Sequence, residues 1–313
     1  MNAKHPNKLL NLVGNTPLVE LPHISPSADI RIFAKLEGQN PSGSIKDRVV
    51  QAIVNKAERQ GDLSPGDTIV EASSGNTAIA LAMVGKQKGY NVNVVIPEGV
   101  APSIGDILNV MGVEITWCTS SSGLKGAIDV AKELARVRER HYYLGQFVDQ
   151  INVETHYSTT GREIAQALPT VTTFVAGIGT GGTISGVGKR LKEDIPGVQI
   201  VGVEPQMGER LQGLRSLTEG FVPALLDLDI LDRRFLVDSA SALRAARKIF
   251  ETEGVMVGVS SGAALHAALR VADKMTEGDI VVMCADAAWK YLPAKPWDAA
   301  DEGSAALDER YWW

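Results

Sequence analysis

A lysine with the surroundings of a reactive amine stands in residues 41–48, which read PSGSIKDR. Apolar residues recur at helix-face spacing over 49–57, and Ser44 is predicted to be the N-cap of this helix. Lys46 then lies in the first turn, where the helix dipole disfavours a cation and favours the unprotonated amine that carbonyl chemistry requires. The alternative is a solvated lysine beside two charged neighbours, Asp47 and Arg48.

A glycine-rich turn, GIGTGGT at 177–183, separates a predicted strand from a predicted helix. Its backbone N–H groups and the positive end of the helix suit an anion such as a phosphate. The pattern Gly177-x-Gly179-x-x-Gly182 also matches a dinucleotide fingerprint, with Glu204 22 residues beyond Gly182. A nicotinamide or flavin enzyme is therefore an alternative, as is a tight turn without a ligand. The chain has no GxxxxGKS or GxxxxGKT pattern, which argues against a P-loop NTPase.

Two more polar loops precede predicted helices. The first is SSGNT at 73–77, whose hydroxyls, carboxamide and backbone N–H groups suit a carboxylate. The second is GVSSGAA at 258–264, which offers a hydroxyl at another strand-to-helix junction. The alternative for both loops is helix capping, with Ser73 or Ser74 as the N-cap of the first helix.

The elements that carry these loops alternate between strands and helices, which predicts βαβ units and mostly parallel sheets in two architectural halves. Residues 205–238 are predicted to be irregular. The expected strands are 31–37, 68–71, 93–97, 114–117, 172–176, 199–203 and 279–283. The expected helices are 46–57, 75–88, 103–111, 124–138, 153–167, 183–194, 240–253 and 261–275.

The bulk composition excludes several classes of protein. The 313 residues carry a net charge of −6 without a Lys/Arg-rich run, so neither nucleic acid nor an anionic membrane is an expected partner. Cys118 and Cys284 lie far apart, which argues against a disulfide framework or a metal site. No apolar run at the start predicts a signal peptide, and none is long enough to span a bilayer. We expect a reduced, cytoplasmic protein.

Taken together and in order, the four motifs resemble the cysteine synthase family of fold type II pyridoxal 5'-phosphate (PLP) enzymes. The resemblance extends from GNTPL at 14–18 to residue 292. It implies an α/β fold like that of the tryptophan synthase β subunit, with two domains, each an open and mostly parallel sheet flanked by helices. The small mobile domain is expected at 39–148. The large domain is expected at 1–38 plus 149–313, with a C-terminal tail at 293–313.

The resemblance also implies a role for each motif residue. Lys46 forms the Schiff base with PLP and later removes the substrate Cα proton. Asn76 hydrogen-bonds the ring hydroxyl, and Ser260 faces the pyridine nitrogen. The residues expected to cradle the cofactor phosphate are Gly179, Thr180, Gly181, Gly182 and Thr183. The residues expected to bind the substrate carboxylate are Ser73, Ser74, Asn76, Thr77 and Gln146.

Departures from the family pattern indicate a branch. The usual acidic and basic run after the PE turn is replaced by APSIG at 101–105, and the segment near the end reads ADAAWKYL at 285–292. The second form resembles the O-phosphoserine-dependent branch, in which Arg215 would contact the substrate phosphate. That branch implies a thiocarboxylated sulfur-carrier protein as a possible sulfur source. It also implies a tail that enters the cleft, and the chain ends in Tyr311-Trp312-Trp313.

The predicted function is therefore β-replacement on an activated serine by a homodimer. O-phosphoserine is favoured over O-acetylserine, and an α-aminoacrylate intermediate reacts with a sulfur donor to give L-cysteine. The same fold could instead make another β-substituted alanine, and a PLP-dependent β-lyase or deaminase is a further alternative. A non-catalytic binding protein is opposed by the retained Lys46. The nicotinamide alternative would leave Lys46, the 73–77 loop and Ser260 without tasks.

Overall fold

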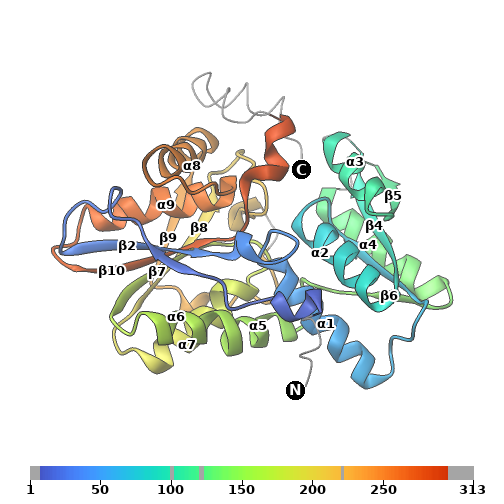
Figure 1. Ribbon diagram of the computed structural model, residues 1–313. Helices are drawn as coiled ribbons and strands as arrows, with labels where there is room; N and C mark the ends of the chain where they lie inside the picture. Colours follow the sequence, from blue (N-terminus) through green and yellow to red (C-terminus); the bar gives the residue numbers. More distant parts are fainter. Residues whose placement is uncertain (1–7, 99–101, 120–122, 220–221, 295–313) are drawn as a thin grey trace, which may run out of the picture.

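The computed structural model describes residues 8–98, 102–119, 123–219 and 222–294. Two separate sheets organise these residues, with the larger sheet on the left of Figure 1 and the smaller one on the right. The larger sheet is parallel except for its first strand, which runs antiparallel to the second. Its strands, in spatial order, are β1 (Leu18–Glu20), β2 (Ile30–Leu36), β10 (Gly278–Cys284), β7 (Val171–Gly177), β8 (Gln199–Pro205) and β9 (Arg233–Val237).

The smaller sheet is entirely parallel and is covered by helices on both faces. Alternation along the strands separates the two cores: Ile69 and Val94 face one apolar cluster, whereas Val70 and Val95 face the other. Helices α1, α2 and α3 join the first cluster, and α4 joins the second. The strands, in spatial order, are β5 (Glu114–Cys118), β4 (Asn91–Pro97), β3 (Thr68–Ala72) and β6 (His141–Tyr143). The helices are α1 (Lys46–Gln60), α2 (Asn76–Lys88), α3 (Pro102–Val110) and α4 (Gly123–Val137).

The larger sheet is also packed on both faces (Figure 1). Ile280 and Val282 of β10 face α8 and α9, whereas Val281 and Met283 face the layer that contains α6 and α7. Alternate residues of one strand therefore enter two different cores, as expected of a buried parallel strand. The helices are α5 (Ile151–His156), α6 (Arg162–Ala167), α7 (Gly182–Asp194), α8 (Ser239–Glu253) and α9 (Val259–Ala272). A π-helical segment at Tyr157–Gly161 joins α5 to α6. Short 3₁₀ segments are η1 (Leu9–Leu12), η2 (Glu37–Gln39), η5 (Leu217–Glu219), η6 (Leu228–Ile230) and η7 (Ala288–Ala294).

The expected α/β class with two open, mostly parallel sheets is confirmed. The sequence did not predict the short strands β6 and β9, and β9 lies inside the stretch expected to be irregular. The expected helix at 153–167 is interrupted by the π-helical segment. The domain boundaries stay a prediction. Leu10 and Val13, assigned to the large domain, pack against the core shared by α1 and α2.

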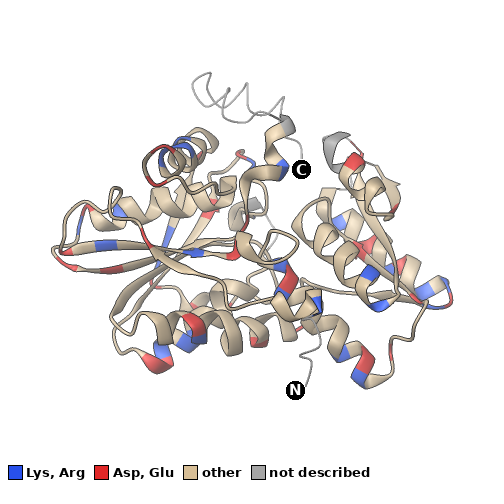
Figure 2. Cartoon of the chain, in the orientation of Figure 1, with Lys and Arg blue, Asp and Glu red and all other residues tan. Residues whose placement is uncertain are grey.

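Charged side chains of both signs are interspersed along both halves of the molecule (Figure 2). No helix among the described residues combines the length and the apolar character needed to cross a membrane. The same part of the chain holds no cluster of three or more His, Cys, Asp or Glu side chains placed to bind a metal ion. The C-terminal aromatic residues 311–313 and most of the predicted tail lie outside the described residues, as does residue 101 of the APSIG segment.

Candidate active site

A cavity of about 750 Å³ opens between the two sheets. The loop after β3 lines it from the smaller sheet, and the loops after β7 and β8 line it from the larger sheet. These are the carboxyl ends of parallel strands, where α/β proteins place their ligands. The cavity brings together most of the residues that the sequence singled out: Lys46, Ser73, Ser74, Asn76, Thr77, Gln146, Gly179, Thr180 and Arg215. The predicted residues that do not line it are Gly181, Gly182, Thr183 and Ser260.

Lys46 lies in the first turn of α1, as predicted, and is the first residue of that helix, but the reason for the helix start differs. The segment before it is pinned to a distant part of the chain, because Ile45 N donates to Ala285 O at 2.8 Å and Ala287 N donates to Gly43 O at 3.1 Å. The prediction that Ser44 is the N-cap was wrong, since Ile45 occupies that position without a side-chain cap. Backbone pairing with residues 285–287 therefore positions the lysine.

The Lys46 amine has the lowered proton affinity that carbonyl chemistry needs. Burial in the cavity wall is the largest cause, and the positive charge of Arg215 adds to it, so that the pKa of Lys46 falls to about 8. The negative charge of Asp286 opposes this fall. About a tenth of such an amine is unprotonated at pH 7, far more than for an ordinary lysine with a pKa of about 10.4. The sequence predicted the direction from the helix dipole, whereas the structure attributes it to burial and neighbouring charges.

The glycine loop between β7 and α7 requires glycine at several positions. Gly181 has a positive φ of 85° and precedes the first residue of α7. A Cβ atom at Gly179 would overlap the carbonyl oxygen of Gly213, and one at Gly182 would overlap the side chain of Asn152. The loop is thus a close-packed backbone turn at a helix N-terminus, which suits an anion.

Two threonines of this loop are held by buried partners. Thr180 Oγ1 accepts from Asn152 Nδ2 at 3.2 Å. Thr183 Oγ1 lies 3.2 Å from His156 Nε2, and His156 Nδ1 lies 3.0 Å from Thr160 Oγ1. Burial, with smaller contributions from the charges of Lys46 and Arg48, lowers the pKa of His156 well below its usual value, so this imidazole is neutral.

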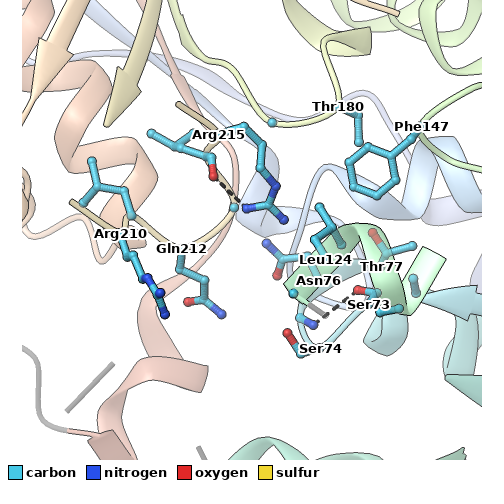
Figure 3. Close-up of a pocket in the computed structure, with 18 of the residues that line it drawn as sticks. Ser73, Ser74, Asn76, Thr77, Leu124, Phe147, Thr180, Arg210, Gln212 and Arg215 are labelled. Atoms are coloured by element: carbon cyan, nitrogen blue, oxygen red, sulfur yellow. Dashed lines mark hydrogen bonds between the residues drawn. The ribbon is translucent and has the colours of Figure 1, made fainter. Parts of the chain in front are cut away.

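The polar loop at 73–77 forms the opposite wall. Figure 3 shows Ser73, Ser74, Asn76 and Thr77 grouped together across the cavity from Arg215. The Thr77 hydroxyl donates to Gln146 Oε1 at 2.7 Å. The capping alternative was wrong in detail, since α2 begins after Gly75 and has no side-chain cap. The serine hydroxyls are therefore not committed to capping this helix.

Arg215 presents a partly buried guanidinium that has no acidic partner among the described residues. Its Nη1 donates to the backbone oxygen of Leu214 at 2.7 Å, and its Nε has no hydrogen-bond partner among the described residues (Figure 3). Burial lowers the pKa of Arg215 to about 10, so the group is still a cation at neutral pH. Glu209, an acidic residue of the same loop, accepts a hydrogen bond from Ser239 Oγ at 2.5 Å.

Glu204, the acid of the dinucleotide alternative, is committed to structural contacts. It is buried, and its carboxylate accepts from Leu217 N at 2.7 Å and from Arg234 Nη1 at 3.2 Å. No oxygen of Glu204 lines the cavity. Glu204 is therefore not available to bind the ribose of a dinucleotide in this cavity, which argues against the dinucleotide alternative.

Ser260 and Asp286 do not line the cavity, and the turn before Ser260 contacts Asp286. Ser260 is the second residue of α9 and is buried. Gly258, at the N-cap of that helix, donates its backbone N–H to Asp286 O at 3.1 Å. The Asp286 carboxylate accepts from Asn76 Nδ2 at 2.8 Å. Asp286 was missed as a functional candidate, although the sequence marked the surrounding ADAAWKYL segment as unusual.

The sequence also matches known families over most of its length. Residues 9–286 match the family model described as pyridoxal-phosphate dependent enzyme, and the chain belongs to this family. It therefore depends on PLP, and the predicted cofactor is confirmed. A cysteine synthase from Staphylococcus aureus is 40% identical over 293 residues, covering 90% of this chain and 94% of that protein. Cysteine synthase B from Pseudomonas aeruginosa is 37% identical over 299 residues, covering 95% and 99%.

Two solved structures resemble the fold closely. An O-ureido-L-serine synthase has a TM-score of 0.89 and 34% identity, covering 96% of this chain and 99% of that chain. A cysteine synthase from Entamoeba histolytica has a TM-score of 0.86 and 32% identity, covering 99% and 96%. The fold type II architecture expected from the sequence motifs is thereby confirmed.

Proposed function

We propose that this protein forms L-cysteine by PLP-dependent β-replacement on O-phosphoserine, with a sulfur donor as the second substrate. The relatives named cysteine synthase, which match nearly the whole chain, support the formation of cysteine. The observation that carries the choice of O-phosphoserine is the guanidinium of Arg215, which lies on the cavity wall, is partly buried with an unpartnered Nε, and has no carboxylate partner among the described residues. O-acetylserine carries an uncharged acetyl ester, which would not form an ion pair with that cation.

The cavity residues fit the cofactor. When bound, PLP withdraws electrons from the substrate and so makes its Cα proton and its β-substituent easier to remove. Lys46 supplies a primary amine with a lowered pKa for attachment and for moving the Cα proton. The backbone turn from Gly179 to Thr183, at the N-terminus of α7, suits the phosphate group. Asn76 would contact the ring hydroxyl, and Ser260 would face the ring nitrogen.

The substrate carboxylate fits the wall opposite Arg215. Ser73, Ser74 and Thr77 surround the start of α2, where a helix N-terminus favours an anion. Gln146 fixes the Thr77 hydroxyl from the neighbouring loop. With the carboxylate held here, the β-substituent of the substrate would point across the cavity toward Arg215.

Charge makes Arg215 selective for a phosphate ester. A phosphate monoester carries about −1.5 to −2 charges near neutral pH, whereas an acetyl ester carries none. The planar guanidinium matches phosphate oxygens with paired donors. Binding would also supply a counter-charge to a cation whose hydration is reduced by burial. Arg215 therefore favours O-phosphoserine, whose phosphate group is already negatively charged when the substrate binds.

The test is the Arg215→Ala variant of the holoenzyme, measured with both activated serines. We expect kcat/KM for O-phosphoserine to fall by about 10- to 150-fold, on the order of 1.5–3 kcal/mol for a charge-assisted hydrogen bond. The value for O-acetylserine should change little. Arg215→Lys retains the charge and should lose less, and Arg247→Ala, on the exposed side of α8, serves as the matched control.

Equal losses on the two substrates, or a wild-type enzyme that prefers O-acetylserine, would contradict the assignment of O-phosphoserine. The second candidate function is the synthesis of another β-substituted alanine, which the similarity to an O-ureido-L-serine synthase favours. A sulfur donor that gave no product, while a nitrogen or oxygen nucleophile did, would support this candidate. Activity without any nucleophile would support a β-lyase or deaminase.

Two parts of the proposal concern partners and rest on the sequence motifs. The sulfur donor would include a thiocarboxylated carrier protein, and the enzyme would be a homodimer. Comparing free sulfide with a thiocarboxylated protein as donor tests the first part, and the mass of the protein in solution tests the second.

A further inference from the structure

Asp286 is a buried carboxylate that gathers three donors on one oxygen. Its Oδ2 accepts from Asn76 Nδ2 at 2.8 Å and from the Tyr291 hydroxyl at 2.7 Å, and it pairs with Lys290 Nζ at 2.6 Å. Asp286 is 1% exposed and Lys290 is 2% exposed, so the ion pair is screened from water. Charged groups that are buried to this extent are energetically costly unless they are paired. Here the Oδ2 atom of Asp286 has three partners.

Asp286 contacts three segments that carry proposed cofactor residues, two of them through its backbone and one through its side chain. Ser44 pairs with Asp286 in an antiparallel bridge, two residues before Lys46. Gly258 N donates to Asp286 O at 3.1 Å, two residues before Ser260. Asn76, the third contact, is the first residue of α2. A Cβ atom at Gly258 would overlap Asp286 Oδ1, so this carboxylate packs directly against the turn that begins α9.

The contact with Asp286 fixes the orientation of the Asn76 amide. An ionised carboxylate only accepts hydrogen bonds, so the nitrogen of Asn76 faces Asp286 and the amide cannot rotate without losing this bond. The nitrogen keeps a second hydrogen for another acceptor. The oxygen of the same amide is buried and has no partner among the described residues. Asp286 therefore determines which atoms of Asn76 are available to a ligand.

Asp286 also acts on Lys46 through its charge. Burial and the charge of Arg215 lower the pKa of Lys46, and Asp286 opposes them. Other described ionisable groups that face Asp286 come from its own segment. Lys290 and Tyr291 bond to it. The pKa of the Cys284 thiol is raised mainly by burial and to a smaller extent by the charge of Asp286. A second carboxylate in this region, Asp47, acts on Lys290.

We propose that Asp286 is a positioning residue for the cofactor: it aims the Asn76 amide at the ring hydroxyl oxygen, and its charge favours the protonated linkage between Lys46 and the cofactor. This inference rests on the proposed attachment of PLP to Lys46. The protonated linkage is the more electrophilic form, so it is the one that an incoming amino group attacks more readily. Asp286 would thus prepare the site for substrate without touching the substrate.

The test follows the visible absorption band of the holoenzyme between pH 6 and 11, because the protonated and unprotonated linkages absorb at different wavelengths. We expect the midpoint of this transition in Asp286→Asn to move toward acid by on the order of one pH unit, since an adjacent opposite charge has been removed. Tyr291→Phe is the matched control. It removes one hydrogen bond to the same oxygen but keeps the charge and the Asn76 contact, so its midpoint should stay near that of the wild type.

A second variant covers the risk that an unpaired Lys290 prevents folding. The double variant with Asp286→Asn and Lys290→Gln replaces the ion pair by two neutral groups of similar size, and its midpoint should also move toward acid. The proposal would be overturned if the variants that fold had the same midpoint as the wild type. It would also be overturned if none of the proteins showed a transition up to pH 11. A shift of the same size in Tyr291→Phe would overturn it as well, because such a shift would indicate general loosening.

Lys46→Ala separates the two hypotheses. If this variant keeps the pH-dependent band of a lysine-linked cofactor, the proposed attachment fails and the role of Asp286 fails with it. If the band disappears while the Asp286 variants titrate like the wild type, only the role of Asp286 fails.

Discussion

A buried ionic network beside the active-site helix gives the most quantitative prediction about stability. Glu163, in α6, accepts from Arg48 Nη1 at 2.7 Å and from Lys35 Nζ at 2.6 Å. Arg48 also donates from Nε to Glu37 at 2.7 Å, and Thr16 Oγ1 donates to Glu37 at 2.6 Å. Arg48 lies in α1 and Lys35 in β2, so Glu163 connects the helix that carries Lys46 to the larger sheet.

The size of the effect follows from the pKa of Glu163. Burial opposes its ionisation, but the hydrogen bonds and charges of Arg48 and Lys35 outweigh burial and lower the pKa from 4.5 to about 2. Each pKa unit corresponds to about 1.4 kcal/mol, so the ionised carboxylate contributes about 3 kcal/mol to the free energy of unfolding at pH 7. Because the folded-state pKa is depressed, this contribution is fully present above pH 4.5 and is lost as the pH falls toward 2.

Glu163→Gln should therefore unfold at a lower urea concentration at pH 7, with a loss of about 3 kcal/mol in the free energy of unfolding. The difference from wild type should shrink to about 2 kcal/mol at pH 3.5, where the wild-type carboxylate has begun to lose its advantage. Glu133→Gln, at an exposed pair with Arg136, is the matched control and should have no measurable effect.

Equal urea midpoints for wild type and Glu163→Gln at pH 7 would refute this reasoning. A loss that stayed constant between pH 7 and pH 3.5 would refute the electrostatic part, because a packing defect does not depend on protonation.

Two further variants test the cofactor loop and its support. Gly179→Ala should weaken PLP binding about tenfold or more in an equilibrium titration, because its Cβ would overlap Gly213 O, whereas Gly105→Ala, in open space, should not. His156→Gln should flatten the dependence of stability on pH between 6.5 and 5. As the pH falls through this range, the free energy of unfolding of the wild type should decrease by up to about 1.4 kcal/mol per pH unit. The reason is that the imidazole binds a proton in the unfolded state but not when it is buried. An unchanged slope would mean that His156 is not held neutral.

The sequence predicted loops that converge on one cavity, because these loops follow parallel strands. Ser73 follows β3 and Gly179 follows β7, and the carboxyl ends of both strands open into one cavity. Short apolar runs predicted those strands, because a parallel strand that is buried on both faces is apolar at nearly every position. The positions of Lys46 and of the 73–77 loop in the cavity thus follow from local pattern combined with general rules of α/β topology.

Strands at the edges of sheets escaped prediction for a physical reason. β9 begins with Arg233 and Arg234, both exposed, and only Val237 is buried. β6 spans three residues, His141–Tyr143, none of them fully buried. Neither segment carries the continuous apolar run of a core strand. Each becomes a strand because a neighbour, β8 or β3, supplies hydrogen-bond partners.

The contacts that set the chemistry of Lys46 were not predictable from local sequence, because its partners come from distant segments. Asp286 lies 240 residues after Lys46 and Arg215 lies 169 residues after it, yet both charges act on its amine. Those charges have opposite effects, so the state of the amine depends on their balance. An anion bound at Arg215 would offset the charge of that arginine, which is one of the two influences that lower the pKa of Lys46, and would leave burial opposed by Asp286. A substrate with a negatively charged leaving group would therefore change the charge balance around Lys46 when it binds, which an uncharged ester could not do.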